Sequence, residues 1–162
     1  MRESLFASLE SMDAIDGARV LDLYAGSGAL GLEALSRGAA SAELVERGRP
    51  AAAVIRRNAE RVVKALGAAS ATARVHESAV RAQLLRATGP FDLVFTDPPY
   101  DLSDDDMTAD LVALAPLLSP EAVVVIERAK RATPPDLDRA GLALIRDRVY
   151  GDTALWWAEP SR

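Results

Sequence analysis

The segment 22–31 reads Asp-Leu-Tyr-Ala-Gly-Ser-Gly-Ala-Leu-Gly and directly follows the apolar run 18–21. Its glycines, Gly26, Gly28 and Gly31, have the spacing GxGxxG, which allows a tight turn from a strand into a helix and a close approach of the backbone to a ligand. An acidic residue, Glu46, stands twenty residues after Gly26, at the end of the next predicted strand, 41–46. This arrangement is typical of the first βαβ unit of a sheet that binds a nucleotide at its carboxyl edge.

Short apolar runs continue to alternate with stretches of helical periodicity, which predicts an α/β fold with a mostly parallel sheet. The predicted strands are 18–23, 41–46, 71–75, 91–95 and 122–126, followed by an antiparallel pair at 141–150 and 153–158. The predicted helices are 3–12, 30–35, 50–66, 78–85 and 104–118. No repeat or low-complexity linker interrupts the pattern, so we expect a single domain over residues 1–162.

Composition narrows the function classes. The chain has no cysteine, so it has no disulfide framework and no thiolate metal site. No apolar run reaches the roughly 18 residues that cross a membrane, and the N-terminus lacks a signal-peptide core, so we expect a cytoplasmic protein without a membrane partner. The net charge of −5 does not favour a polyanionic partner, and we expect the basic residues at 56–64 and 128–131 to lie mainly on solvated helix faces.

Asp22, at the end of the first predicted strand, indicates which nucleotide the glycine turn suits. A carboxylate at this place attracts an ammonium group but repels the pyrophosphate of a dinucleotide. His76 is the only histidine, and no residue is placed to assist hydride transfer. S-adenosyl-L-methionine, a nucleoside that carries an amino acid and a sulfonium, fits better, and Glu46 would accept hydrogen bonds from its ribose hydroxyls.

The loop Asp97-Pro98-Pro99-Tyr100 follows the fourth predicted strand. The two prolines stiffen the loop and remove two N–H donors, so that it presents carbonyl acceptors. The Asp97 carboxylate and the Pro98 carbonyl would hold an amino group conjugated with an aromatic ring and stabilise the positive charge that develops there during methyl transfer. Tyr100 would stack on a base that is exposed or flipped out of its stack. The loop therefore predicts methylation of an exocyclic amine.

The residues fit several other functions less well. Methylation of cytosine C5 needs a cysteine nucleophile and is disfavoured, as is a metal-dependent mechanism, because no cluster of metal ligands stands out. Methylation of N6 of adenine in DNA or RNA remains open, since the same loop serves that amine. Methylation of a protein glutamine is less favoured because that loop usually begins with asparagine. A non-catalytic module of the same fold that binds a nucleotide is a further alternative.

Four segments, in the same order, resemble the RsmD-like family of bacterial 16S rRNA guanine-N2 methyltransferases. The segments are Arg-Glu-Ser-Leu-Phe at 2–6, the glycine turn at 21–31, Asp-Pro-Pro-Tyr at 97–100 and Val-Tyr-Gly-Asp-Thr at 149–153. The two central motifs are common among amino-methyltransferases, and the two outer ones make the resemblance specific. It covers essentially the whole chain and implies a Rossmann-like class I methyltransferase fold, with a seven-stranded sheet, a reversed last strand and helices on both faces.

The resemblance also implies the roles of individual residues. The methyl acceptor would be N2 of a guanine in 16S rRNA within an assembling 30S particle, bound by a monomer that holds no metal. The catalytic residues would be Asp97, Pro98, Pro99 and Tyr100, which would receive the acceptor amine. S-adenosyl-L-methionine would be held by Asp22, Tyr24, Ala25, Gly26, Ser27, Gly28, Glu46, Arg47, Ser78, Ala79 and Asp97.

The chain departs from the family pattern in two places. Relatives often have Asp or Asn where this chain has Ser78, although a serine can still contact the adenine amine. Relatives also carry a basic β-hairpin, implicated in RNA binding, ahead of the Arg-Glu-Ser-Leu-Phe segment. We expect this chain to lack that hairpin, which would account for its acidic balance, and therefore to bind the cofactor but to bind RNA weakly.

Overall fold

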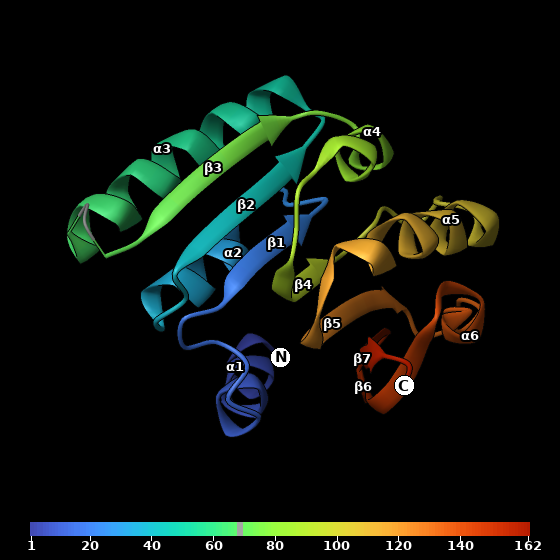
Figure 1. Ribbon diagram of the computed structural model, residues 1–162. Coiled ribbons are helices and arrows are strands. Elements are labelled where there is room, and N and C mark those ends of the chain that lie inside the picture. Colours follow the sequence, from blue (N-terminus) through green and yellow to red (C-terminus); the bar gives the residue numbers. More distant parts are fainter. Residues whose placement is uncertain (68–69) are drawn as a thin grey trace.

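The computed structural model describes residues 1–67 and 70–162, and its core is one seven-stranded sheet (Figure 1). The strands are β1 (Arg19–Leu23), β2 (Ser41–Glu46), β3 (Thr72–Glu77), β4 (Phe91–Thr96), β5 (Leu118–Ala129), β6 (Leu142–Tyr150) and β7 (Thr153–Pro160). The helices are α1 (Arg2–Ser11), α2 (Ala29–Ser36), α3 (Arg49–Leu66), α4 (Val80–Arg86), α5 (Asp104–Leu114), the 3-10 turn η1 (Ala115–Leu117) and α6 (Leu137–Ala140).

The strand order is β3-β2-β1-β4-β5-β7-β6. Strands β1 to β5 pair in parallel, whereas β7 is antiparallel to both of its neighbours, β5 and β6. The order reverses beside β1, and ligands of open α/β sheets bind at the carboxyl ends of the strands at such a point. The predicted class I methyltransferase fold with a reversed last strand is confirmed.

Helices cover both faces of the sheet, and each face has its own apolar cluster. Helices α1, α2 and α3 pack on one face through side chains such as Phe6, Leu35 and Ile55. Helices α4, α5 and α6 pack on the other through Leu84, Met107 and Ala140. Alternate residues of the central strands contribute to the two clusters, as expected of a sheet buried on both sides.

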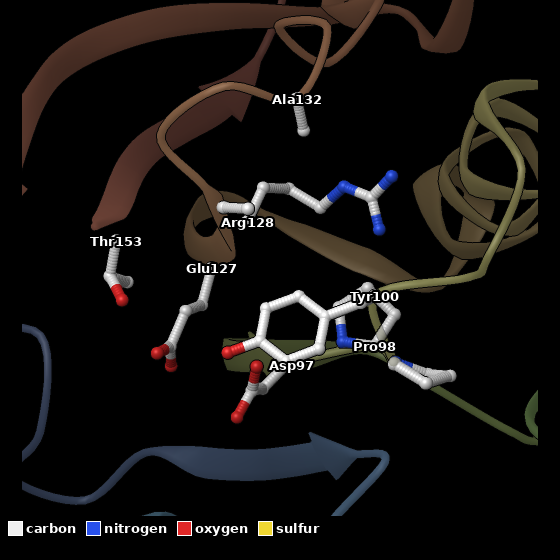
Figure 2. A pocket seen from close by; sticks show the side chains of 9 residues that line it. Asp97, Pro98, Tyr100, Glu127, Arg128, Ala132 and Thr153 are labelled. Carbon is white, nitrogen blue, oxygen red and sulfur yellow. The ribbon is translucent and has the colours of Figure 1, made fainter.

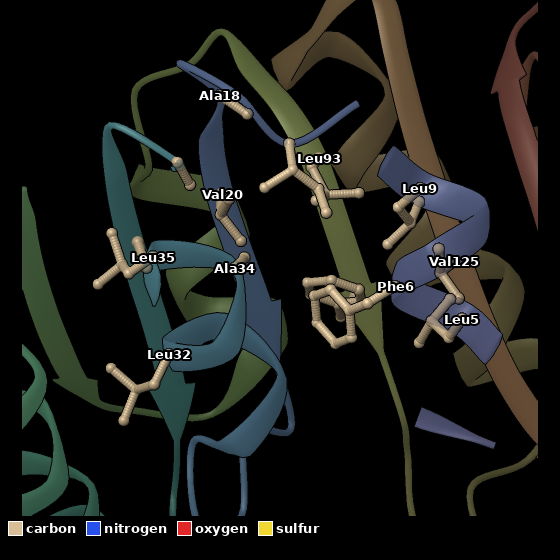
Figure 3. Packing of buried hydrophobic residues seen from close by; sticks show 14 of the residues in the cluster. Leu5, Phe6, Leu9, Ala18, Val20, Leu32, Ala34, Leu35, Leu93 and Val125 are labelled. Carbon is tan, nitrogen blue, oxygen red and sulfur yellow. The ribbon is translucent and has the colours of Figure 1, made fainter. Parts of the chain in front are cut away.

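Helix α1 packs the first of the four family-like segments against the centre of the sheet. Phe6 is fully buried, its ring centroid lies 5.8 Å from that of Phe95 on β4, and Leu5 and Leu9 lie beside it (Figure 3). The Ser4 and Tyr150 hydroxyl groups form a 2.9 Å hydrogen bond, which joins this segment to the last one. The two outer motifs therefore meet in space and have a structural role.

The structure departs from the predicted elements most clearly at helix α5, strand β5 and helix α6. The predicted helix 104–118 ends at Leu114, because Pro116 has no N–H to continue the helical ladder, and Leu118 already belongs to β5. Strand β5 continues past Ile126 to Ala129 because it pairs there with β7. The four-residue helix α6 was not predicted, since it is too short to show a periodicity. Consequently the basic residues 128–131 lie at the end of a strand and in a turn, not on a helix.

None of the helices in the described ranges, 1–67 and 70–162, is both long enough and apolar enough to span a membrane.

Candidate active site

The residues predicted to form the site are brought together at one edge of the sheet. Strands β1 to β4 are parallel neighbours, so the loops after their carboxyl ends lie side by side. Backbone hydrogen bonds connect these loops to adjacent strands, from Ala25 N–H to the Val45 carbonyl (2.9 Å) and from Ser78 N–H to the Glu46 carbonyl (3.1 Å). The edge carries residues 22–28, 46–47, 78–79 and 97–100.

The turn between β1 and α2 requires glycine at two positions for different reasons. Gly28 has φ of 81°, and a Cβ there would lie 3.1 Å from the side chains of Ile55 and Leu44. Gly31 lies in the first turn of α2, and a Cβ there would lie 3.1 Å from Asp22 Oδ2. By contrast, nothing lies within 4 Å of where a Cβ of Gly26 would be, so the backbone there is open to a ligand.

Asp22 is buried at the end of β1 with an exposed fraction of 3 %. Its Oδ2 accepts a 2.9 Å hydrogen bond from Gly31 N–H, which anchors the carboxylate to the first turn of α2. Burial raises the pKa of Asp22 to about 7, against the effect of this hydrogen bond and with smaller contributions from the charges of Asp97 and Glu46. An acid held in this way gains most from a cation placed beside it.

Glu46, at the end of β2, is held by two backbone amides. Its Oε1 accepts from Gly26 N–H (3.0 Å) and its Oε2 accepts from Gly48 N–H (2.7 Å). The carboxylate is half-buried beside the glycine turn. Both oxygens keep a free lone pair, so the group can accept two further hydrogen bonds, as the vicinal hydroxyls of a ribose require.

The remaining residues of the predicted cofactor site lie on either side of this carboxylate. Arg47 follows Glu46 and is exposed, whereas Ser78 is half-buried and its hydroxyl donates to the Ala79 carbonyl (3.0 Å). Ser27 is exposed, and its carbonyl accepts from the Asn58 side-chain amide of α3 (3.1 Å). Their contacts with a cofactor stay predictions.

The Asp97 loop borders a cavity of about 300 Å³, the lower end of the roughly 300–1,000 Å³ typical of small-molecule sites. Pro98 is buried and fixes the loop, whereas Asp97 and Tyr100 are exposed at the cavity. The ring of Tyr100, 90 % exposed, stands over the opening beside Asp97 (Figure 2). A planar group that entered beside this ring would have its edge near the Asp97 carboxylate.

Sequence reasoning missed the opposite wall of the cavity. Glu127, Arg128 and Ala132 come from the end of β5 and the turn after it, and Thr153 begins β7 (Figure 2). A signal was available for Glu127, which ends the apolar run 122–126 and so had to lie at the same sheet edge as Asp97. Arg128 is buried, its guanidinium donates to the Leu102 carbonyl (3.1 Å), and it thereby fastens the segment that follows Tyr100.

Asp97 and Glu127 form a carboxyl pair in the cavity. Burial, and to a smaller extent the charge of Asp97 and a hydrogen bond between the two side chains, together raise the pKa of Glu127 to about 7. The pKa of Asp97 is also raised, because the cavity walls partly shield it from water, although the hydrogen bond from Glu127 opposes this. The two groups therefore ionise in a coupled way, and the ionised form of Glu127 becomes the main one above about pH 7.

Tyr24 connects the first loop to the helices on one face. Its hydroxyl donates to Asp110 Oδ2 of α5 (2.5 Å), and Arg81 Nε of α4 donates to Asp110 Oδ1 (2.8 Å). The pKa of Tyr24 is raised, first by burial and then by the hydrogen bond to Asp110. Tyr24 has a positive φ of 58°, which is unusual for a residue other than glycine, and this network holds it there.

A Tyr24→Phe variant should lose about 2 kcal/mol of unfolding free energy, because a buried charged acceptor loses one donor. The matched control is Tyr150→Phe, which removes the exposed hydrogen bond to Ser4 and should cost less than about 0.5 kcal/mol. Urea unfolding followed by circular dichroism measures both. Equal losses in the two variants would contradict a structural role for the Tyr24 network.

Among residues 1–67 and 70–162, no group of three or more His, Asp or Glu side chains is arranged to hold a metal ion.

Comparison with known proteins identifies the family. The family model described as "Conserved hypothetical protein 95" matches residues 1–159. The ribosomal RNA small subunit methyltransferase D of Escherichia coli K12 is 36% identical over 155 residues, which cover 95% of this chain and 73% of the relative. That of Haemophilus influenzae is 32% identical over 153 residues, covering 93% of this chain and 75% of the relative.

Solved structures agree. A conserved hypothetical protein of Streptococcus pyogenes superposes with a TM-score of 0.80 at 34% identity, covering 96% of this chain and 94% of the other. A magnesium protoporphyrin IX methyltransferase of Synechocystis, solved with bound SAM, has a TM-score of 0.78 at 16% identity over 98% of this chain and 77% of its own, and so shows the fold alone. The chain therefore belongs to the Conserved hypothetical protein 95 family, that of the RsmD-like methyltransferases.

Proposed function

We propose that this protein, an S-adenosyl-L-methionine-dependent rRNA methyltransferase, transfers the methyl group to N2 of a guanine in 16S rRNA. The observation that carries the proposal is the cavity beside the cofactor edge, where Asp97, Pro98 and Tyr100 line one side of a space large enough for one planar base. The E. coli relative's name as a small subunit rRNA methyltransferase supports the substrate class.

The residues at the carboxyl edge fit S-adenosyl-L-methionine. The open backbone at Gly26 leaves room for the ligand, and Glu46 can accept from both ribose hydroxyls. The Asp22 carboxylate would face the ammonium of the methionine part. When bound, the cofactor supplies a methyl group on a sulfonium sulfur, which keeps the electron pair of the broken S–C bond while the acceptor nitrogen forms the new bond and loses a proton.

The side chains of the Asp97 loop would prepare the acceptor amine. An amine conjugated with an aromatic ring is a weak nucleophile because its lone pair is delocalised. Hydrogen bonds to the Asp97 carboxylate and the Pro98 carbonyl would orient that lone pair and stabilise the positive charge on nitrogen. Tyr100, exposed at the opening, would stack on the base once it has left its own stack.

Nucleoside mass spectrometry of 30S particles treated with the protein and cofactor tests the proposal. The particles should come from a strain that lacks the corresponding methylation, so that the target is free. We expect N2-methylguanosine as the product, located in 16S RNA. N6-methyladenosine as the sole product would refute the proposed base, and methylation of protein alone would refute the RNA substrate.

The proposed substrate also indicates where the reaction takes place. We expect the protein to work as a monomer on the assembling 30S particle in the cytoplasm, where 16S RNA is available.

Cofactor affinity should rise with pH in the neutral range. Because the pKa of Asp22 is raised to about 7, the carboxyl group is protonated at pH 6 and ionised at pH 8, where it attracts the ammonium. We expect the dissociation constant to fall about tenfold between these values, since each pKa unit is worth about 1.4 kcal/mol. Calorimetric titration at several pH values, in buffers of different ionisation enthalpy, measures both the affinity and the proton released.

Ionisation of Asp22 has the opposite effect on stability: it favours cofactor binding but disfavours the folded state of the free protein. Its folded pKa is higher than its ordinary value of 3.8, so the folded protein retains a proton that the unfolded chain loses, and the unfolding free energy of the free protein falls as pH rises from about 4 to about 7. In Asp22→Asn the pH dependence of cofactor affinity and that of the unfolding free energy should both weaken. Asp13→Asn, in the exposed turn after α1, should preserve both. Unchanged pH dependence in Asp22→Asn would show that another group is responsible.

A further inference from the structure

The two carboxyl groups in the cavity are placed side by side by the pairing of two strands. Strands β4 and β5 are parallel with Thr96 opposite Ile126, so the next residues, Asp97 just after the end of β4 and Glu127 still within β5, lie at neighbouring positions. Both line the cavity, and in Figure 2 both carboxyl groups lie in the part of it beside the Tyr100 ring. A ligand that reaches one of them therefore also meets the other.

Nothing in the described part of the chain neutralises this pair. Neither Asp97 nor Glu127 is within 4.0 Å of a lysine, arginine or histidine nitrogen in the described ranges, unlike Glu43, which has both His76 and Arg19. The neighbouring cation, Arg128, is turned away and lies 3.8 Å from Asp104 Oδ1. Two half-shielded carboxyl groups without a cation are unfavourable unless a ligand brings hydrogen-bond donors.

The Watson–Crick edge of guanine supplies two such donors. It presents the N2 amino group next to the ring N1–H, so it offers two adjacent donors to two adjacent acceptors. Adenine presents its N6 amino group next to an unprotonated N1, which is an acceptor and would face the second carboxyl group, in its ionised form, without a hydrogen between them. A site that hydrogen-bonds one of these groups strongly rejects an analogue that lacks it.

We propose that Glu127 determines the choice of base: its carboxylate accepts the N1–H of guanine while Asp97 accepts a hydrogen of N2, and the pair rejects adenine. This inference rests on the proposed function, because it concerns the base that enters the same cavity. Glu127 would touch the substrate at N1 but not the nitrogen that is methylated. Its removal should therefore change which bases are accepted more than it changes cofactor binding.

The test uses 2-aminopurine, which keeps the amino group of guanine but has an unprotonated N1. After mass spectrometry has located the target nucleotide, 30S particles are assembled from 16S RNA ligated with guanine, 2-aminopurine or adenine at that position. At pH 8, where Glu127 is mainly ionised, the wild-type protein should prefer guanine to 2-aminopurine by at least about 50-fold in kcat/KM. In Glu127→Gln the preference should fall below about fivefold, because a glutamine amide can present either its oxygen or its NH2 group to N1.

Glu121→Gln, an exposed position near the start of the same strand, is the matched control and should keep the full preference. Glu127→Asp, which retains the carboxylate, should be slower but should still prefer guanine. The cofactor dissociation constant, measured by calorimetry, should stay within about threefold in every variant, which verifies folding. Comparing variant with wild type cancels the intrinsic reactivity of the two amines.

An undiminished preference for guanine in Glu127→Gln would overturn the inference. The inference would also be overturned if Glu121→Gln lost as much of the preference as Glu127→Gln. Failure of the proposed function has a different result, because the wild-type protein would then methylate none of the guanine-containing particles at N2. A wild-type protein that methylates guanine and 2-aminopurine equally well would support the proposed function and overturn the role of Glu127.

Discussion

An Asp97→Ala variant is expected to bind S-adenosyl-L-methionine but to methylate RNA with a kcat about 100- to 1,000-fold below that of the wild type, the range observed when one preorganised polar group is removed from a reacting centre. The carboxylate would otherwise orient the acceptor amine and stabilise the positive charge that grows on it. Asp97 is exposed at the cavity, and Glu127, its hydrogen-bond partner, faces the same cavity, so water can replace the lost carboxylate and the fold should tolerate the change.

Single-turnover measurements with preformed enzyme, cofactor and RNA separate the methyl-transfer step from binding and product release. Asp101→Ala removes an equal charge from the exposed turn next to the loop and should change kcat by less than about threefold. The charge of Asp97 also contributes to the raised pKa values of Asp22 and Glu127. The variant should therefore shift the pH dependence of cofactor affinity to lower pH. Full turnover in Asp97→Ala would remove the proposed mechanism.

The chemistry of this site was readable from the sequence because parallel strands place successive loops at one edge. Because Asp22, Glu46 and Asp97 each stand at the end of a predicted strand, their proximity follows from the alternation of strands and helices, without any knowledge of side-chain contacts. The strand order β3-β2-β1-β4 then brought these three loops together. Their roles toward cofactor and base rest on chemistry and stay predictions.

The alternation of strands and helices does not predict side-chain contacts between distant segments. The pairing of Tyr24 with Asp110 and Arg81 joins a turn to two helices, and none of these residues signals its partner through spacing. Glu127 was predictable in position but not in function, since only the register of β4 with β5 shows that it meets Asp97. The end of α5 was missed because helical periodicity ran on through Leu118, whereas Pro116 interrupts the hydrogen-bond ladder.

A Glu46→Ala variant is expected to bind the cofactor about 100-fold more weakly. Two hydrogen bonds from ribose hydroxyls to a carboxylate contribute about 1.5–3 kcal/mol each, and water at the vacated position offsets part of their loss. The amides of Gly26 and Gly48 already orient the carboxylate, so the wild-type protein loses little side-chain entropy on binding. The cofactor affinity of Glu46→Gln should lie between those of Glu46→Ala and the wild type, because an amide offers one acceptor oxygen in place of two.

Calorimetric titration with S-adenosyl-L-homocysteine should show the same loss as the titration with the cofactor, since the two share the ribose and differ at the sulfur. Glu43→Gln is the matched control, because Glu43 lies on the same strand but contacts His76 (2.8 Å) and Arg19 (3.7 Å). The dissociation constant of this variant for the cofactor should match that of the wild type. Equal weakening by Glu43→Gln would point to a general disturbance of β2. An undiminished affinity in Glu46→Ala would place the ribose elsewhere, and the geometry of the glycine turn would then have to be explained by packing alone.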